Sequence, residues 1–267
     1  MKNTLKLIGD MMLKSYKIFC PNLNKFITLE IYIKKHKKGQ INDALYILDG
    51  QNAFKDKDAT FKRSLRFTKY VDLFKDTRNI NICAIAIKSY EDDIERTNEY
   101  LPYKFEINTK WNKNQNLSIS KAFTNDFINT IIPFINAIFN INDSYIFGAS
   151  LGALYASFIA NNYTIFKGCG LFSICPFLCE KAFYKDLSIN KRQKLKTFIY
   201  VGKNEESDSL FDKDLYLNSA LKLYDFLNND NTRLLIDENG VHNEESWEKH
   251  IIDFLSFIYS NSNIKQK

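Results

Sequence analysis

The stretch IFGASLGAL, residues 146–154, decides the fold that this sequence predicts. Apolar residues before Gly148 indicate the end of a buried strand, and the apolar run that begins at Leu151 indicates a helix. Between them stands the pattern G-x-S-x-G, whose glycines permit a sharp turn in which a Cβ atom would clash with the neighbouring strand and helix. Such a turn holds the Ser150 hydroxyl above the sheet, where a base and a substrate carbonyl can reach it. An ordinary strand-to-helix turn built from small residues is the alternative interpretation.

Length and composition favour one globular domain over residues 1–267, since 45% of the residues are apolar and no linker is visible. The formal net charge is +6, from lysines spread along the whole chain. Two basic clusters, 34–38 and 191–194, lack the interleaved aromatic residues and the recognisable module of a nucleic-acid site. We therefore expect no nucleic-acid partner, although a modest attraction for anionic substrates stays open.

No apolar run reaches the roughly 20 residues that cross a bilayer. The apolar stretch within residues 1–17 is interrupted by Gly9, Asp10 and Lys14, which does not fit a secretory leader. The five cysteines are odd in number and lack the paired spacing of a zinc site, so free buried thiols are expected. We expect a cytoplasmic protein without membrane partner, metal or cofactor. A leader missing from the given sequence remains an alternative, and the oligomeric state is left open.

Strand and helix patterns alternate along the chain and predict a mostly parallel sheet with helices on both faces. The expected strands are 26–33 (antiparallel), 44–48, 80–87, 144–147, 167–172, 197–201 and 232–236. The expected helices are 59–76, 120–139 with a kink or late start at Pro133, 151–161, 215–228 and 244–259, with short helices and loop over 173–195. The polar segment 104–120 is either a substrate loop or a solvated connection.

A serine hydroxyl becomes a nucleophile when a base, usually a histidine oriented by a carboxylate, takes its proton. The chain has three histidines, and in hydrolases with this turn the chain order is serine, acid, histidine. His36 precedes Ser150, and His250 lies inside the last expected helix. His242 follows the strand 232–236, in a loop at the same sheet edge as Ser150. We therefore favour His242 as the base, with His250 as the alternative.

The other components of such a site are an acid and two oxyanion donors. The loop after the strand 197–201 offers Glu205, Glu206 and Asp208 as acids, and at least two of them are surface carboxylates. Backbone N–H groups stabilise the oxyanion by about 3–4 kcal/mol each. The N–H of Leu151 is the first expected donor, and the second is expected in the segment 49–52, after an earlier strand.

Five ordered segments resemble motifs of the putative esterase family of α/β-hydrolases. They are YILDGQN (46–52), RTNEYLP (96–102), GASLG (148–152), YVGKNE (200–205) and HNEESW (242–247). The family includes enterochelin esterases, S-formylglutathione hydrolases of the esterase D type, feruloyl esterases and mycolyltransferases. The resemblance covers about residues 40–258 and implies an α/β-hydrolase fold. The cysteine-rich and proline-rich signatures of the S-formylglutathione branch are missing, so the siderophore-esterase branch is nearer.

The resemblance also implies the catalytic roles. Ser150 is the expected nucleophile and His242 the base. By motif position, Glu205 is the first choice for the acid and Asp208 the second. The N–H group of Gln51 joins that of Leu151 as the implied oxyanion hole.

Two further residues are expected to contact substrate. Arg96 faces an acidic or phenolate-bearing substrate in some relatives; an ion pair with Glu99 or Asp49 is the alternative. Trp111 lies in the segment 104–120, which matches no one subfamily well. The implied partner is a small ester.

The sequence thus predicts a serine esterase that works through an acyl-enzyme, on a siderophore trilactone or another small ester. An acyltransferase with the same triad is one alternative. A non-catalytic ligand-binding protein on this scaffold is the other.

Overall fold

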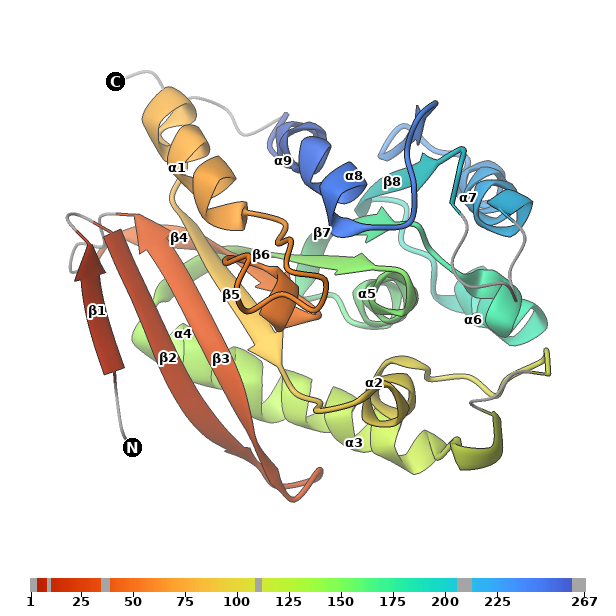
Figure 1. Ribbon diagram of the computed structural model, residues 1–267, viewed down its shortest axis with the longest axis horizontal. Helices are drawn as coiled ribbons and strands as arrows, with labels where there is room; N and C mark the ends of the chain where they lie inside the picture. Colours follow the sequence, from red (N-terminus) through yellow and green to blue (C-terminus); the bar gives the residue numbers. More distant parts are fainter. Residues whose placement is uncertain (1–3, 9–10, 35–38, 109–111, 206–212, 261–267) are drawn as a thin grey trace.

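The structure is a computed structural model that describes residues 4–8, 11–34, 39–108, 112–205 and 213–260. Within these residues, nine strands form one sheet in the order β1-β2-β3-β5-β4-β6-β7-β8-β9 (Figure 1). The strands are β1 Thr4–Ile8, β2 Met11–Cys20, β3 Lys25–Lys34, β4 Ile41–Ile47, β5 Ile82–Lys88, β6 Asn140–Ala149, β7 Phe166–Phe172, β8 Lys196–Gly202 and β9 Thr232–Asp237. Pairing is antiparallel from β1 through β3 to β5 and parallel from β5 to β9. The predicted α/β fold with a mostly parallel sheet is confirmed.

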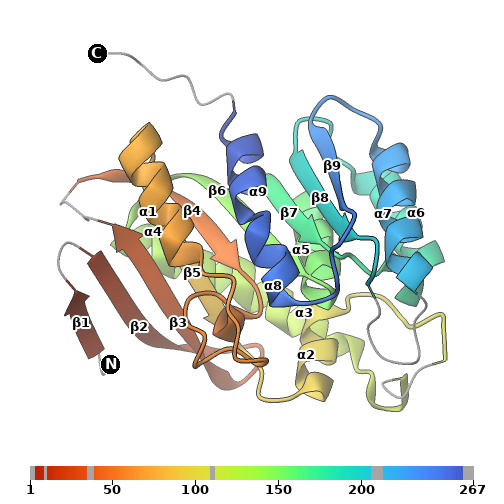
Figure 2. The same ribbon diagram turned by 45° about the horizontal axis from the view of Figure 1, so that its top comes forward.

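Helices cover both faces of this sheet (Figure 2). One face carries α1 Phe67–Arg78, α8 Glu244–Lys249 and α9 Ile251–Ile258. The other carries α3 Leu117–Asp126, α4 Ile132–Ile138, α5 Leu151–Asn162, α6 Glu180–Asn190 and α7 Lys213–Leu227, with α2 Asp93–Tyr100 packed beside α3 and α5. Short 3₁₀ turns are η1 Gly50–Asn52, η2 Asn112–Asn114 and η4 Pro176–Leu178. Among the described residues, no helix has the length and apolar character of a membrane span.

Two apolar cores lie on either side of the sheet, because successive side chains of a strand point to opposite faces. In β4, Ala44 and Tyr46 belong to the core under α3 and α5, while Leu45 and Ile47 belong to the core under α1 and α9. Strands buried on both faces consist of continuous apolar runs, which is why such runs predict the central strands here. The five cysteines are buried and free, as expected.

The helix predicted over 59–76 is wrong in its first half, because α1 begins at Phe67. Side-chain acceptors hold the preceding segment in turns. The Asp56 carboxylate accepts hydrogen bonds from the N–H and hydroxyl of Ser64 and from Arg66. Such local side-chain bonds compete with helical ones.

The other differences also have local causes. The helix expected over 120–139 contains a π-helical turn, Phe127–Ile131, directly before Pro133, whose ring nitrogen cannot donate. The helix expected over 244–259 is interrupted at His250, and the segment 173–195 contains a full helix, α6. The strands β1 and β2 were not predicted, although buried and exposed side chains alternate in the second half of β2.

Candidate active site

Three residues at the ends of adjacent parallel strands have a left-handed backbone. They are Asp49 after β4 (φ 51°), Ser150 after β6 (φ 54°) and Ser173 after β7 (φ 51°). Residues other than glycine rarely adopt this conformation, and such strain clusters at functional sites. Because these strands are parallel neighbours, the three residues lie at one edge of the sheet.

The turn around Ser150 has the predicted form of a strand, a sharp bend and a helix. A Cβ atom on Gly148 would lie 2.2 Å from the carbonyl oxygen of Gly152, which explains the first glycine. A Cβ atom on Gly152 would lie 2.9 Å from Oδ2 of Asp49. The N–H of Ser150 donates to the carbonyl of Phe172 on β7 (2.8 Å), so the turn is attached to the neighbouring strand.

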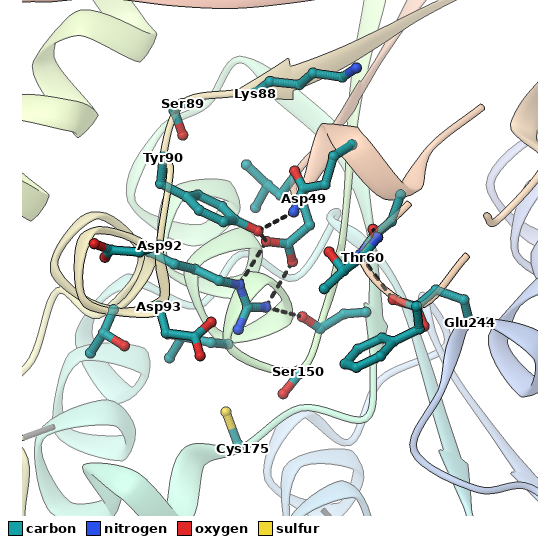
Figure 3. Close-up of a pocket in the computed structure, with 18 of the residues that line it drawn as sticks. Asp49, Thr60, Lys88, Ser89, Tyr90, Asp92, Asp93, Ser150, Cys175 and Glu244 are labelled. Carbon is teal, nitrogen blue, oxygen red and sulfur yellow. Dashed lines mark hydrogen bonds and ion pairs between the residues drawn. The ribbon is translucent and has the colours of Figure 1, made fainter. Parts of the chain in front are cut away.

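A cavity of about 860 Å³ opens at this edge (Figure 3). Five of the residues singled out in the sequence line it: Ser150, His242, Gln51, Leu151 and Arg96. They come from four separate parts of the chain, so the fold brings together residues that are distant in sequence. A cavity of this size accommodates a ligand much larger than a short-chain ester.

His242 and Glu205 form a hydrogen-bonded pair beside the cavity. Nδ1 of His242 lies 3.2 Å from Oε2 of Glu205, whose side chain is fully buried. The imidazole ring lies between Tyr216 and Trp247, with centroid distances of 4.5 and 5.0 Å. A neutral imidazole that donates from Nδ1 has an acceptor at Nε2, the form that a general base needs.

The second carboxylate oxygen of Glu205 is held equally well. Oε1 accepts hydrogen bonds from the N–H of Gly202 (2.7 Å) and the hydroxyl of Ser173 (2.5 Å). The Ser173 hydroxyl in turn accepts from Nε1 of Trp247 (2.8 Å). Both oxygens of the buried carboxylate therefore have partners, and its direction toward His242 is fixed.

The candidate bases and acids differ in their contacts and in whether they lie at the cavity. The ring of His250 contacts the carboxylates of Asp237 (3.2 Å) and Asp253 (3.0 Å) and does not line the cavity. Glu205 is the acid that contacts His242, while Glu206 and Asp208 lie outside the described residues. His36 and Trp111 also lie outside them.

Two backbone N–H groups at the cavity wall are available to a ligand. Among the described residues, neither the N–H of Gln51 nor that of Leu151 has a hydrogen-bond acceptor. Leu151 is the first residue of α5, where helical N–H groups lack partners. Gly50 lets the Gln51 loop approach β5 closely, because a Cβ atom there would lie 2.5 Å from the backbone nitrogen of Ile87.

Arg96 is engaged in the ion pair with Asp49 that the sequence offers as an alternative. Its Nε and Nη2 lie 2.7 and 2.8 Å from the two carboxylate oxygens of Asp49. Burial acts to lower the pKa of Arg96, but the Asp49 carboxylate outweighs it and raises this pKa well above the usual value. The other alternative partner, Glu99, instead pairs with Lys25 (2.7 Å). Arg96 lines the cavity with its charge already compensated.

Sequence reasoning missed three residues that support the site: Tyr90, Ser173 and Glu244. Tyr90 contacts Asp49, and Glu244 accepts a hydrogen bond from Nδ2 of Asn52 (2.9 Å). Burial raises the pKa of Glu244 above its ordinary value. Ser173 and Tyr90 both follow apolar strands at the edge that holds Ser150, and this position is the one signal that could have identified them.

Comparison with known proteins identifies a family and a common fold. A family model described as putative esterase matches residues 21–258. Among solved structures, the chain is similar to an IroE-like serine hydrolase from Shewanella oneidensis, with a TM-score of 0.72 and 14% identity over 96% of this chain and 82% of the other. The siderophore hydrolase EstA from Aspergillus nidulans is similar at a TM-score of 0.69, with 14% identity over 92% and 94%. An S-formylglutathione hydrolase from Agrobacterium tumefaciens is similar at 0.61, with 16% identity over 97% and 99%. No curated protein matches the chain. At these identities the structural likeness shows a common fold.

Proposed function

The chain belongs to the putative esterase family of carboxylic ester hydrolases, and we propose that it cleaves its substrate through an acyl-enzyme on Ser150. One observation carries this proposal. A buried carboxylate, Glu205, holds the ring of His242 at the wall of the cavity that Ser150 also lines. A nucleophile, a base and an acid that orients the base are the groups with which serine hydrolases of this kind perform acyl transfer.

The reaction follows from these contacts. Nε2 of His242 takes the proton of the Ser150 hydroxyl while Oγ attacks the ester carbonyl carbon. The N–H groups of Gln51 and Leu151 donate to the oxyanion that forms. The bond to the alcohol breaks, and His242 returns the proton to the leaving oxygen. Water then attacks the acyl group with His242 again as base, which releases the acid and restores Ser150.

We propose a siderophore trilactone or another ester of comparable size as the substrate. The cavity volume of about 860 Å³ supports an ester larger than acetyl or butyryl model compounds. Two of the similar structures bear the titles IroE-like serine hydrolase and siderophore hydrolase. A panel of siderophore trilactones, feruloyl esters, S-formylglutathione and short acyl esters, each assayed with and without alcohol acceptors, separates these substrates. Transesterified product in place of free acid would favour an acyltransferase.

A fluorophosphonate probe tests the nucleophile directly. We expect one phosphonyl adduct per chain, located on Ser150 by peptide mass spectrometry, because the activated oxygen displaces fluoride from phosphorus. Heat-denatured protein is the control, since unfolding separates Ser150 from its base. Folded protein that does not react would favour a ligand-binding role instead.

Exchanging His242 for glutamine removes the base, and we expect kcat for p-nitrophenyl butyrate to fall at least about 10³-fold. His250→Gln is the matched control, because His250 has two carboxylate partners and lies away from the cavity. It should keep most of the wild-type kcat. A larger loss in the control than in His242→Gln would exchange the roles of the two histidines.

A further inference from the structure

The side chain of Gln51 belongs to a chain of hydrogen bonds along the cavity wall, which continues through Tyr90 and Asp49 (both labelled in Figure 3). Nε2 of Gln51 donates to the hydroxyl of Tyr90 (2.5 Å). The Tyr90 hydroxyl donates to Oδ1 of Asp49, and the Asp49 carboxylate is held by Arg96 through two bonds. The chain of contacts therefore runs from Gln51 in the oxyanion loop, through Tyr90 and Asp49, to the partly buried guanidinium of Arg96.

The same network also contacts the serine turn. Nη2 of Arg96 lies 3.5 Å from the carbonyl oxygen of Ala149, the residue before Ser150. Asp49 packs against Gly152, since its Oδ2 lies 2.9 Å from the position of a Cβ atom there. The backbone N–H of Asp49 donates to the hydroxyl of Tyr100 (3.2 Å). The ion pair between Arg96 and Asp49 is therefore linked to the Gln51 loop through Tyr90 and contacts the turn that carries the Leu151 N–H.

The Gln51 peptide is held on its carbonyl side by the Gly50–Asn52 turn, in which the Gly50 carbonyl accepts from the N–H of Ala53 (3.2 Å). Its N–H has no acceptor among the described residues, and it follows Gly50, which restricts the backbone least. The Gln51 side chain adds a second connection, since it links this turn to the hydroxyl of Tyr90. The direction of each hydrogen bond is also defined: a carboxylate only accepts, so Tyr90 must donate to Asp49 and accept from Gln51.

We propose that Tyr90 is a positioning residue, which aims the backbone N–H of Gln51 at the oxyanion by holding the Gln51 side chain. This inference rests on the proposed function of Ser150. Burial, followed by the Asp49 charge, raises the pKa of Tyr90 well above its ordinary value. The hydroxyl therefore stays protonated and keeps both of its hydrogen bonds across the neutral pH range.

A double-mutant cycle tests the inference. Tyr90→Phe keeps the ring that packs on Tyr100 and removes the hydroxyl, while Gln51→Met keeps the backbone N–H and removes the amide. Losing an oxyanion donor outright lowers kcat by about 10²–10³-fold, so a misdirected donor should lower it by about 10-fold, with KM within about twofold of wild type. We expect both single variants to show this loss and the double variant to lose no more than either, because both changes break the same link.

Two further measurements separate positioning from a general structural role. An alkyl trifluoromethyl ketone forms a tetrahedral adduct with an oxyanion, so its inhibition constant should rise by the same factor by which kcat falls. Tyr32→Phe is the matched control, since it also removes a tyrosine–aspartate hydrogen bond (to Asp72, 2.8 Å) but lies outside the cavity lining. It should leave kcat and the inhibition constant unchanged.

Other outcomes overturn the inference. Losses that multiply in the double variant would mean that Tyr90 and Gln51 act separately. A raised KM with normal kcat would make Gln51 a substrate contact. A failure of the proposed function is recognised separately, as wild-type turnover that survives Ser150→Ala. In that case a crystal structure of Tyr90→Phe still decides the matter, because a Gln51 peptide in its wild-type orientation contradicts the inference.

Discussion

Replacing Ser150 by alanine is expected to lower kcat for ester hydrolysis by at least about 10⁴-fold, because no other group in the proposed mechanism can carry the acyl intermediate. Alanine keeps the Cβ atom, so the strained backbone at φ 54° and ψ −122° is unchanged. The melting temperature should therefore stay within about 2 °C of wild type. The measurement pairs initial rates on p-nitrophenyl butyrate with a thermal melt followed by circular dichroism.

The comparison also needs a serine-to-alanine exchange nearby that removes no reacting group. Ser157→Ala, in the same helix α5 and buried, provides it. That variant should retain wild-type kcat. If Ser150→Ala keeps more than about 1% of wild-type kcat while remaining folded, the acyl-enzyme mechanism does not hold.

Glu205→Gln is expected to lower kcat by about 10³–10⁴-fold with little change in KM. The oxygen of the new amide can still accept from Gly202 and Ser173, which leaves its NH₂ group facing Nδ1 of His242. That arrangement favours the tautomer with the proton on Nε2, where the ring can no longer accept a proton from Ser150.

Asp208→Asn is the control for Glu205→Gln, since both remove one negative charge and the two positions are three residues apart in the sequence. It should leave kcat within about twofold of wild type. A larger loss in Asp208→Asn than in Glu205→Gln would assign the acid to Asp208. Stopped-flow or steady-state assays at several pH values give kcat and KM for both variants under identical conditions.

The sequence was most informative where chemistry and local geometry coincide. The glycines around Ser150 predict the turn because the space for a Cβ atom is missing, and the structure has that turn. The order of serine, acid and histidine argues against His36, and the loop position after the strand 232–236 favours His242 over His250; of these two, His242 is the one that contacts Glu205 at the cavity. Continuous apolar runs likewise predict strands that are buried on both faces.

Features that depend on distant partners could not be predicted. The sequence leaves Arg96 open between substrate and ion pair, because the choice depends on the conformation of Asp49, 47 positions away. The hydrogen bond from Ser173 to Glu205 depends on the pairing of β7 with β8, because each residue follows one of these strands and the two are 32 positions apart. The early start predicted for α1 fails for a local reason instead, since the Asp56 side chain accepts from the backbone N–H of Ser64 that the helical pattern requires.

The left-handed backbone at Asp49, Ser150 and Ser173 lowers the stability of the folded protein at the positions that the proposed turnover needs. Each such residue destabilises the native state by of order 1–3 kcal/mol. Glycine at position 150 would relieve that strain at the loss of the reacting hydroxyl, whereas glycine at position 49 or 173 would also remove the hydrogen bonds to Arg96 or Glu205. Laboratory selection for heat tolerance alone should therefore enrich glycine at position 150, and selection for growth on an ester should remove it again.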